Sequence, residues 1–221
     1  MCGRFVLCSP KATIIKEFRV DKTSLQYIPS YNIAPTQNIV IVRENGTKTL
    51  THCKWGLIPS WAKDQSIGHR MINARVETVA EKPAFRSAFK KQRCLVIADG
   101  FYEWKKEKTK TPVYIRLKSG KPFGFAGLYS IWTSPEGQEI CTCTIITTEA
   151  NELLASIHDR MPAIISQDAY DIWLDPNEHD REKLLHLLKP YISHEIELFT
   201  VSKKVNSPSY NSPDNIEPID K

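Results

Sequence analysis

The feature that most restricts the fold is a series of short apolar, β-branched runs in the middle of the chain. Segments of this composition, bounded by polar and turn-forming residues, are typical of β-strands. The runs lie at Ile39–Arg43, Leu50–Trp55, Cys94–Ala98, Val113–Leu117, Phe123–Ala126 and Ile140–Thr147. The sequence therefore predicts that most of the middle of the chain folds as a sheet.

Helical spacing of apolar residues gathers mainly in the second half of the chain. It predicts helices at Lys11–Phe18, Ala84–Lys90, Asn151–Ile157, Asp168–Leu174 and Glu178–Leu188. Because strands and helices do not alternate regularly, the predicted fold class is α+β, with a curved mixed or antiparallel sheet, or a partial β-barrel, flanked by helices. No repeat or linker divides the 221 residues, so we expect one compact domain over residues 1–221, with 207–221 as an extended surface tail.

Composition excludes several classes of protein. Hydrophobic residues make up 41% and charged residues 25% of the chain, which is ordinary for a globular domain and excludes a disordered, coiled-coil or collagen-like chain. No apolar run approaches the roughly 18–20 residues of a membrane helix, and the start lacks the apolar segment of a signal peptide. We therefore expect a cytoplasmic protein without membrane attachment, whose six cysteines are mostly free thiols.

Charge and metal-ligand patterns restrict the partners. The formal charge of +5 permits a nucleic-acid partner without requiring one. The six histidines are scattered, and the cysteines lack the spacing of a zinc site. The sequence consequently predicts neither a metal nor an organic cofactor.

Cys2 is the first residue with distinctive chemistry. Removal of Met1 would leave a free α-amine beside the thiol, and these groups have ordinary pKa values of about 8 and 8.5. Such an aminothiol condenses with an aldehyde: the amine forms an imine, and the thiolate closes onto it as a thiazolidine ring. Arg4 would favour the thiolate. The alternative is an incidental cysteine at a frayed end.

Aromatic and polar residues of two later segments also suit a site. Trp55 and Trp61 flank a Gly/Pro bend, where tryptophans either fill a core or stack on unpaired bases. Asn73 and Arg75 belong to a run that combines an amide, a guanidinium and a carboxylate. That run is either the polar wall of a site or a capped surface loop.

Two ionisable residues follow predicted elements. Glu103 stands among Phe101, Tyr102 and Trp104, so burial would raise its pKa and suit it to acid–base chemistry. The alternative is a structural ion pair. His158 lies just past a predicted helix and precedes an aspartate and an arginine, and it is either a catalytic or a structural histidine.

Taken in order, these segments resemble the SRAP family, the SOS-response-associated peptidases, which includes abasic-site processing proteins. The resemblance rests on the MCGRF start, the NIAPTQ, WGLIPSW, INARVET, DGFYEW and IHDRMP segments, and the late run from Val201 to Pro218. It covers essentially the whole chain, and it implies a compact α+β domain with a sheet-built core and a positively charged DNA groove.

The resemblance also implies a function on single-stranded DNA that carries an abasic site. As the new N-terminus, Cys2 would form a thiazolidine crosslink with the ring-opened sugar and so shield the lesion in the DNA damage response. Asn73 would hold the sugar, Glu103 would assist ring opening, and His158 would transfer protons. The residues expected at the DNA are Arg4, Pro35, Trp55, Trp61, Arg75 and Arg160. Weak lyase activity, self-removal of Met1 and action as a monomer are further expectations.

Two other functions remain open. The protein is then either a thiol peptidase with Cys2 as nucleophile and His158 as base, or a non-catalytic module that binds single-stranded DNA through tryptophans and arginines. A Cys2→Ala change distinguishes them, because it abolishes crosslinking or proteolysis but leaves noncovalent DNA binding intact.

Overall fold

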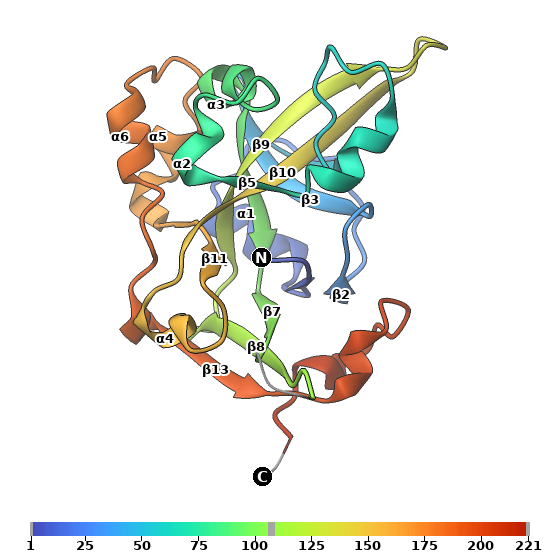
Figure 1. The fold of residues 1–221 in the computed structure, drawn as a ribbon. Coiled ribbons are helices and arrows are strands. Elements are labelled where there is room, and N and C mark those ends of the chain that lie inside the picture. Colours follow the sequence, from blue (N-terminus) through green and yellow to red (C-terminus); the bar gives the residue numbers. More distant parts are fainter. Residues whose placement is uncertain (1, 106–108, 220–221) are drawn as a thin grey trace.

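A closed ring of five strands lies at the centre of the structure, a computed structural model that describes residues 2–105 and 109–219 (Figure 1). The ring runs β10–β4–β3–β6–β9 and returns to β10, because β10 pairs with both β4 and β9. Its strands are β3 (Asn38–Glu44), β4 (Lys48–Trp55), β6 (Arg93–Ala98), β9 (Phe123–Thr133) and β10 (Glu139–Glu149). The pairing of β4 with β10 is parallel and the others are antiparallel.

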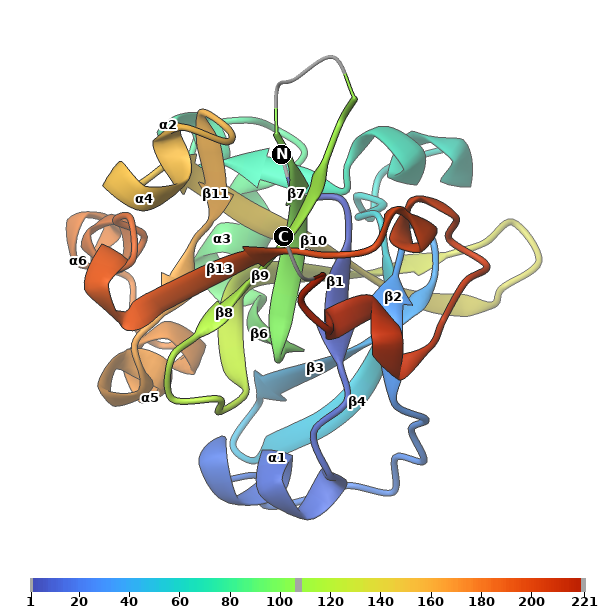
Figure 2. The same ribbon diagram turned by 90° about the horizontal axis from the view of Figure 1, so that it is seen from below.

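A second sheet of five antiparallel strands packs beside this barrel, in the order β13–β8–β7–β1–β2 (Figure 2). Its strands are β1 (Phe5–Leu7), β2 (Ser30–Ile33), β7 (Gly100–Trp104), β8 (Pro112–Leu117) and β13 (Ile196–Thr200). Three short strands extend the barrel sheet: β5 (Asn73–Arg75) and β11 (Arg160–Pro162) on β10, and β12 (Ile164–Ile165) on β9.

The helices are short and lie around the outside of the sheets (Figure 1). They are α1 (Lys11–Glu17), α2 (Val76–Val79), α3 (Arg86–Lys91), α4 (Glu152–Ala155), α5 (Tyr170–Leu174) and α6 (Arg181–His186). Turns of 3-10 helix lie at Gln65–Arg70, Gln167–Ala169, Ser193–Glu195, Lys203–Asn206 and Pro213–Ile216. A single compact α+β domain built on a curved mixed sheet is thus confirmed, and the partial barrel expected from the sequence is a closed one. None of the described helices is long and apolar enough to cross a membrane.

An aromatic contact joins the two sheets next to the start of the chain. The ring of Phe5, on β1, lies edge-on to Trp55 of β4 at 5.2 Å and to Phe125 of β9 at 6.0 Å between centroids. All three side chains are buried. Since such pairs add about 0.5–1.5 kcal/mol each to the burial of apolar area, Phe5 anchors the first residues against the barrel.

The C-terminal segment differs from the expected extended tail. Residues 201–219, called here the C-terminal strap, contain two 3-10 turns and fold back over β2 and β7. Asn215 of the strap is fully buried, and its Nδ2 donates to the carbonyl of Tyr210 at 2.9 Å. The strap is held because its carbonyls find donors on the sheet. Residues 220 and 221 of the expected tail lie outside the described part of the chain.

Four of the six cysteines are free thiols, as expected, and the other two form a disulfide. Cys53 on β4 and Cys141 on β10 are opposite each other across the parallel pair, with Cα atoms 4.9 Å apart, and are bonded. Cys2, Cys8, Cys94 and Cys143 are free thiols. The strand register, which the sequence does not reveal, brings the bonded pair together.

Candidate active site

Cys2 is fully buried, three residues before the anchor Phe5. Its carbonyl oxygen accepts a hydrogen bond of 2.9 Å from Nδ2 of Asn73. Burial raises the pKa of the Cys2 thiol, and the nearby negative charge of Glu103 raises it further. The thiol therefore stays protonated until a neighbouring base removes its proton.

Asn73 is held in position by the pairing of β5 with β10, in which it lies opposite Ile145. Its Nδ2 is used on Cys2, whereas its Oδ1 is buried and has no hydrogen-bond partner within residues 2–105 and 109–219. A buried acceptor without a donor costs about 1–3 kcal/mol. A bound ligand with a hydrogen-bond donor would satisfy this oxygen.

Glu103 enters the site from the second sheet. β7 pairs with β1 through Phe101 and Phe5, and continuing this antiparallel register places Glu103 beside the Cys2–Gly3 segment. The side chain is 4% exposed. Burial raises the pKa of the Glu103 carboxyl, and the charge of Asp159 adds to the effect. Glu103 therefore keeps its proton to higher pH than an ordinary glutamate and can act as a general acid.

His158 lies in the turn between α4 and β11. Its Nδ1 is 2.9 Å from the backbone nitrogen of Arg160 and 2.8 Å from Oδ1 of Asp159. With its proton on Nε2, the neutral ring accepts from the Arg160 amide; with its proton on Nδ1, it donates to the Asp159 carboxylate. Since each protonation state has a partner, the ring is suited to exchange protons. β11, which follows this turn, and β5, which carries Asn73, both pair with β10 around Thr147, so the turn lies close to the strand that holds Asn73.

The two arginines next to the cluster differ in how firmly they are held. Arg160 donates to both carboxylate oxygens of Glu77 and to the carbonyl of Thr147. These hydrogen bonds lower the pKa of the Glu77 carboxyl. Arg75 is exposed and immediately precedes α2. Arg160 is thus fixed in orientation, while Arg75 reaches into solvent.

Arg4 is tied to the C-terminal strap. Its Nη1 donates to Oδ1 of Asn32 at 2.6 Å and to the carbonyl of Val205 at 2.8 Å. Its guanidinium carbon lies 5.9 Å from the ring centroid of Trp104. Its Nε is buried and without a partner in the described residues. Arg4 therefore orders the surroundings of Cys2, and one buried donor remains for a ligand.

The structure separates the two tryptophans that the sequence treats alike. Trp55 is fully buried, and its Nε1 donates to the carbonyl of Ile72 at 2.8 Å, so it is not available to stack on a base. Trp61 is 60% exposed and, with Arg86, lines a hollow of about 200 Å³. Pro35 is half-buried in the turn between β2 and β3. Of these two tryptophans, Trp61 is therefore the one that is accessible for stacking on a base.

Residues from four distant segments therefore meet in one place: Cys2, Asn73, Glu103 and the turn that carries His158. Figure 1 shows β5, β7 and β11 arranged around the first described residues. The sequence did not identify Asn32 as an anchor, although its place in the NIAPTQ segment was a signal. Within the described residues, no three His, Cys, Asp or Glu side chains gather closely enough to hold a metal ion. Removal of Met1 concerns a residue outside the described part.

Comparison with known proteins identifies the family of the chain. A family model described as SOS response associated peptidase (SRAP) matches residues 1–208. The chain belongs to the SRAP family. The resemblance inferred from the sequence motifs is thereby confirmed.

Relatives of this SRAP chain include named proteins. It is 50% identical over 222 residues to the abasic site processing protein YoqW of Bacillus subtilis (strain 168). The matched region covers 98% of this chain and 99% of the relative. It is 33% identical over 227 residues to the abasic site processing protein HMCES of Xenopus tropicalis, covering 88% of this chain and 67% of the relative. A crystal structure of a protein from Bacteroides thetaiotaomicron matches the SRAP chain with a TM-score of 0.90 at 27% identity, covering 99% of this chain and 100% of that one.

Proposed function

We propose that this protein processes abasic sites in single-stranded DNA and forms a thiazolidine crosslink to the sugar through Cys2. The observation that carries the proposal is the meeting of Cys2, Asn73 and Glu103, in which a buried thiol lies beside a carboxyl of raised pKa and a buried carboxamide oxygen without a donor. YoqW, which is named an abasic site processing protein, is 50% identical over nearly the whole length, and this supports the same substrate class.

The first chemical step is opening of the sugar ring. An abasic deoxyribose is mostly a closed hemiacetal, so the ring oxygen must gain a proton while the anomeric hydroxyl loses one. Protonated Glu103 donates to the ring oxygen, and neutral His158, with its own proton on Nδ1 facing Asp159, accepts the hydroxyl proton at Nε2. The product is a free aldehyde, with Glu103 ionised and His158 charged against Asp159.

The second step joins the sugar to Cys2. After Met1 is removed, the α-amine attacks the aldehyde carbon and water leaves, which gives an imine. The thiol proton passes to ionised Glu103, the sulfur adds to the imine carbon, and the imine nitrogen takes up the proton that His158 gained in the first step, which gives the thiazolidine. One water is released overall and no oxidant or reductant is required. Because the imine is consumed, the β-elimination that would cleave the strand is suppressed.

The strand itself is held by charge and stacking. Arg75, Arg160 and Arg4 contact phosphates, and exposed Trp61 stacks on a flanking base. In this proposal one copy of the chain suffices, since the cluster is built from a single chain. Cleavage of the strand through the imine is a minor side reaction, and removal of Met1 is carried out by the same site.

Denaturing electrophoresis tests the proposal directly. The protein is mixed with single-stranded DNA that carries one abasic site, and the controls are intact DNA, a methoxyamine-blocked site and Cys2→Ala. We expect a heat-stable shifted band that needs both Cys2 and the free aldehyde. A non-removable extension before Cys2 should abolish the band, because no α-amine is then available. Absence of the band with protein whose mass lacks Met1 would contradict the proposal.

The same variants distinguish the other two functions. A thiol peptidase would tolerate the extension, since only the thiol is needed, and would cleave a peptide substrate. A non-catalytic binder would give no band with any variant but would bind single-stranded DNA equally well before and after Cys2→Ala.

A further inference from the structure

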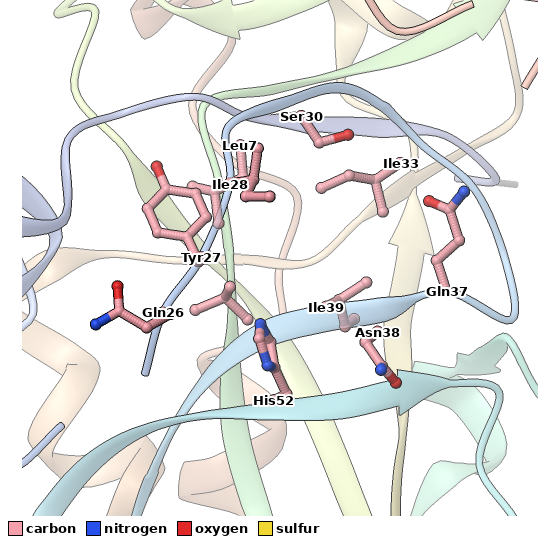
Figure 3. Close-up of a pocket in the computed structure, with 11 residues that line it drawn as sticks. Leu7, Gln26, Tyr27, Ile28, Ser30, Ile33, Gln37, Asn38, Ile39 and His52 are labelled. Atoms are coloured by element: carbon pink, nitrogen blue, oxygen red, sulfur yellow. The ribbon is translucent and has the colours of Figure 1, made fainter. Parts of the chain in front are cut away.

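A cavity of about 290 Å³ lies outside the catalytic cluster, between the segment at 26–33 and strands β3 and β4 (Figure 3). Leu7, Ile33 and Ile39 form an apolar floor. Tyr27 and Ile28 stand over it, and the side chain of Ile28 is 88% exposed. The volume is at the lower end of the range of ligand sites, about 300–1,000 Å³, and suits one ring-sized group.

Three of the polar side chains that line the cavity make no hydrogen bond within the described part of the chain. The side chains of Gln26, Asn38 and His52 line the cavity, and no hydrogen bond joins any of them to another residue within 2–105 and 109–219. Figure 3 shows Asn38 and His52 on adjacent strands below Tyr27. Each carboxamide offers both donors and an acceptor, and partial burial lowers the pKa of His52 and favours its neutral ring.

The cavity is neutral, but a cation lies at its edge. None of its lining residues is an aspartate, glutamate, lysine or arginine. Lys54 lies opposite Asn38 in the register of β3 and β4, so both side chains are on one face of the sheet. A ligand that suits this arrangement has a neutral planar ring with donor and acceptor edges and an anionic group beside it.

We propose that this cavity binds one unpaired nucleobase of the DNA strand whose abasic site reacts at Cys2, so the inference rests on the proposed function. Carboxamides pair with base edges, and the faces of a base pack on aromatic and apolar side chains. Lys54 would contact the adjoining phosphate. A purely apolar occupant, such as a leucine side chain of another protein, would fill the floor but would make no use of the carboxamides of Gln26 and Asn38.

The position of the cavity along β1 sets its distance from Cys2. Leu7 lines it, and Leu7 is five residues from Cys2, of which the last three form β1, so the span of a fully extended chain is an upper limit on the distance. At about 3.3–3.4 Å per residue this span is about 17 Å. The bound base is therefore a few nucleotides from the lesion, and the turn that contains Pro35 lies next to the cavity residues Gln37 and Asn38.

A scan of the strand tests the proposal. Single-stranded DNA with a central tetrahydrofuran site, which has no aldehyde, is given a second tetrahydrofuran at each position in turn, and binding to the full chain is measured by fluorescence anisotropy. We expect one position, away from the lesion and its neighbours, at which loss of the base weakens binding by about five-fold or more. In the double variant Asn38→Ala, His52→Ala that position should no longer matter. The matched control, Asn177→Ala with His179→Ala, removes the same two exposed side-chain types elsewhere and should keep the effect.

The possible results separate this inference from the proposed function. A flat profile, or a positional effect that persists in the Asn38 and His52 variant, would overturn the nucleobase site. Competition by a millimolar free nucleoside without any positional effect would assign the cavity to a free ligand and would also overturn it. The crosslinking band with an ordinary abasic oligonucleotide is measured in parallel, so loss of the band reports on Cys2 chemistry alone.

Discussion

Replacing Asn32 by alanine removes the contacts that fasten the C-terminal strap to β2. The side chain is 1% exposed, and its Nδ2 lies 2.9 Å from the carbonyl of Ser207 and 2.7 Å from that of Tyr210. Its Oδ1 accepts from Arg4 at 2.6 Å. Nδ2 is also 3.2 Å from the carbonyl of Val205, but it carries only two protons, so the side chain counts as making three hydrogen bonds. At about 0.5–1.5 kcal/mol each, they give about 1.5–4.5 kcal/mol. We expect a loss near 3 kcal/mol, about the middle of that range, because water can reach the strap carbonyls but not the Asn32 site.

Urea unfolding followed by far-UV circular dichroism measures this loss. A decrease of about 3 kcal/mol corresponds to a Tm lower by about 6–12 °C for a chain of this size. Asn177→Ala serves as the control, since Asn177 is exposed and a surface change of this kind alters stability by no more than about 0.5 kcal/mol. A loss below about 1 kcal/mol for Asn32→Ala would refute the reasoning, because the strap would then be held by other contacts.

Three further predictions concern the site. Burial raises the pKa of Glu103, so ionising it in the folded state costs stability as the pH rises above the ordinary value of about 4.3. Urea titrations should therefore find Glu103→Gln more stable than the unaltered protein near neutral pH, by a margin that disappears below about pH 4; a margin independent of pH would contradict this. Arg75→Ala should reduce the slope of log Kd against log salt by about 0.7 on single-stranded DNA, measured by anisotropy, and an unchanged slope would remove Arg75 from the phosphate contacts. Trp55→Ala should lower the free energy of unfolding by about 3–5 kcal/mol. Trp61→Ala should leave the free energy of unfolding unchanged and weaken DNA binding about five-fold or more. The reverse pattern in unfolding and anisotropy data would overturn both assignments.

The barrel strands were largely predictable, because short apolar, β-branched runs bounded by turn-forming residues are typical of β-strands. The prediction Cys94–Ala98 corresponds to β6 almost residue for residue. The sequence predicts this strand only as far as Ala126, because Gly127 and Ser130 interrupt the apolar pattern. In the structure β9 continues to Thr133. Gly127 is required by its surroundings: a Cβ there would come within 2.9 Å of the Cys94 sulfur. Close packing between strands thus conceals the strand in the sequence.

The sequence indicates candidate site residues but not their surroundings. Cys2 and Glu103 come from its motifs, the structure adds their burial and their proximity, and their roles stay a prediction. Trp55 and Trp61 could not be told apart, because the burial of Trp55 depends on Phe5, which lies 50 residues earlier in the chain. Local sequence carries no information about such a partner.

The strap was misjudged for a similar reason. Its serines, prolines and asparagines are typical of surface segments, and its anchor, Asn32, lies 173 to 178 residues away. Composition describes what a segment tends to do alone, whereas the strap is ordered by a buried carboxamide from the other end of the chain. Only a long-range contact could have revealed it.

The hydrogen bond between Arg4 and the carbonyl of Val205 can form only late in the synthesis of the chain. Its partners are 201 residues apart. At about 5–20 residues per second, a ribosome takes roughly 10–40 s to make Val205 after Arg4. During that interval the beginning of the chain lacks this contact and is open to the aminopeptidases that trim nascent proteins. Once Val205 arrives, Arg4 is tied to the strap, so removal of Met1 by the site itself, as proposed above, belongs to the finished chain, whereas removal by an external enzyme would belong to the time of synthesis.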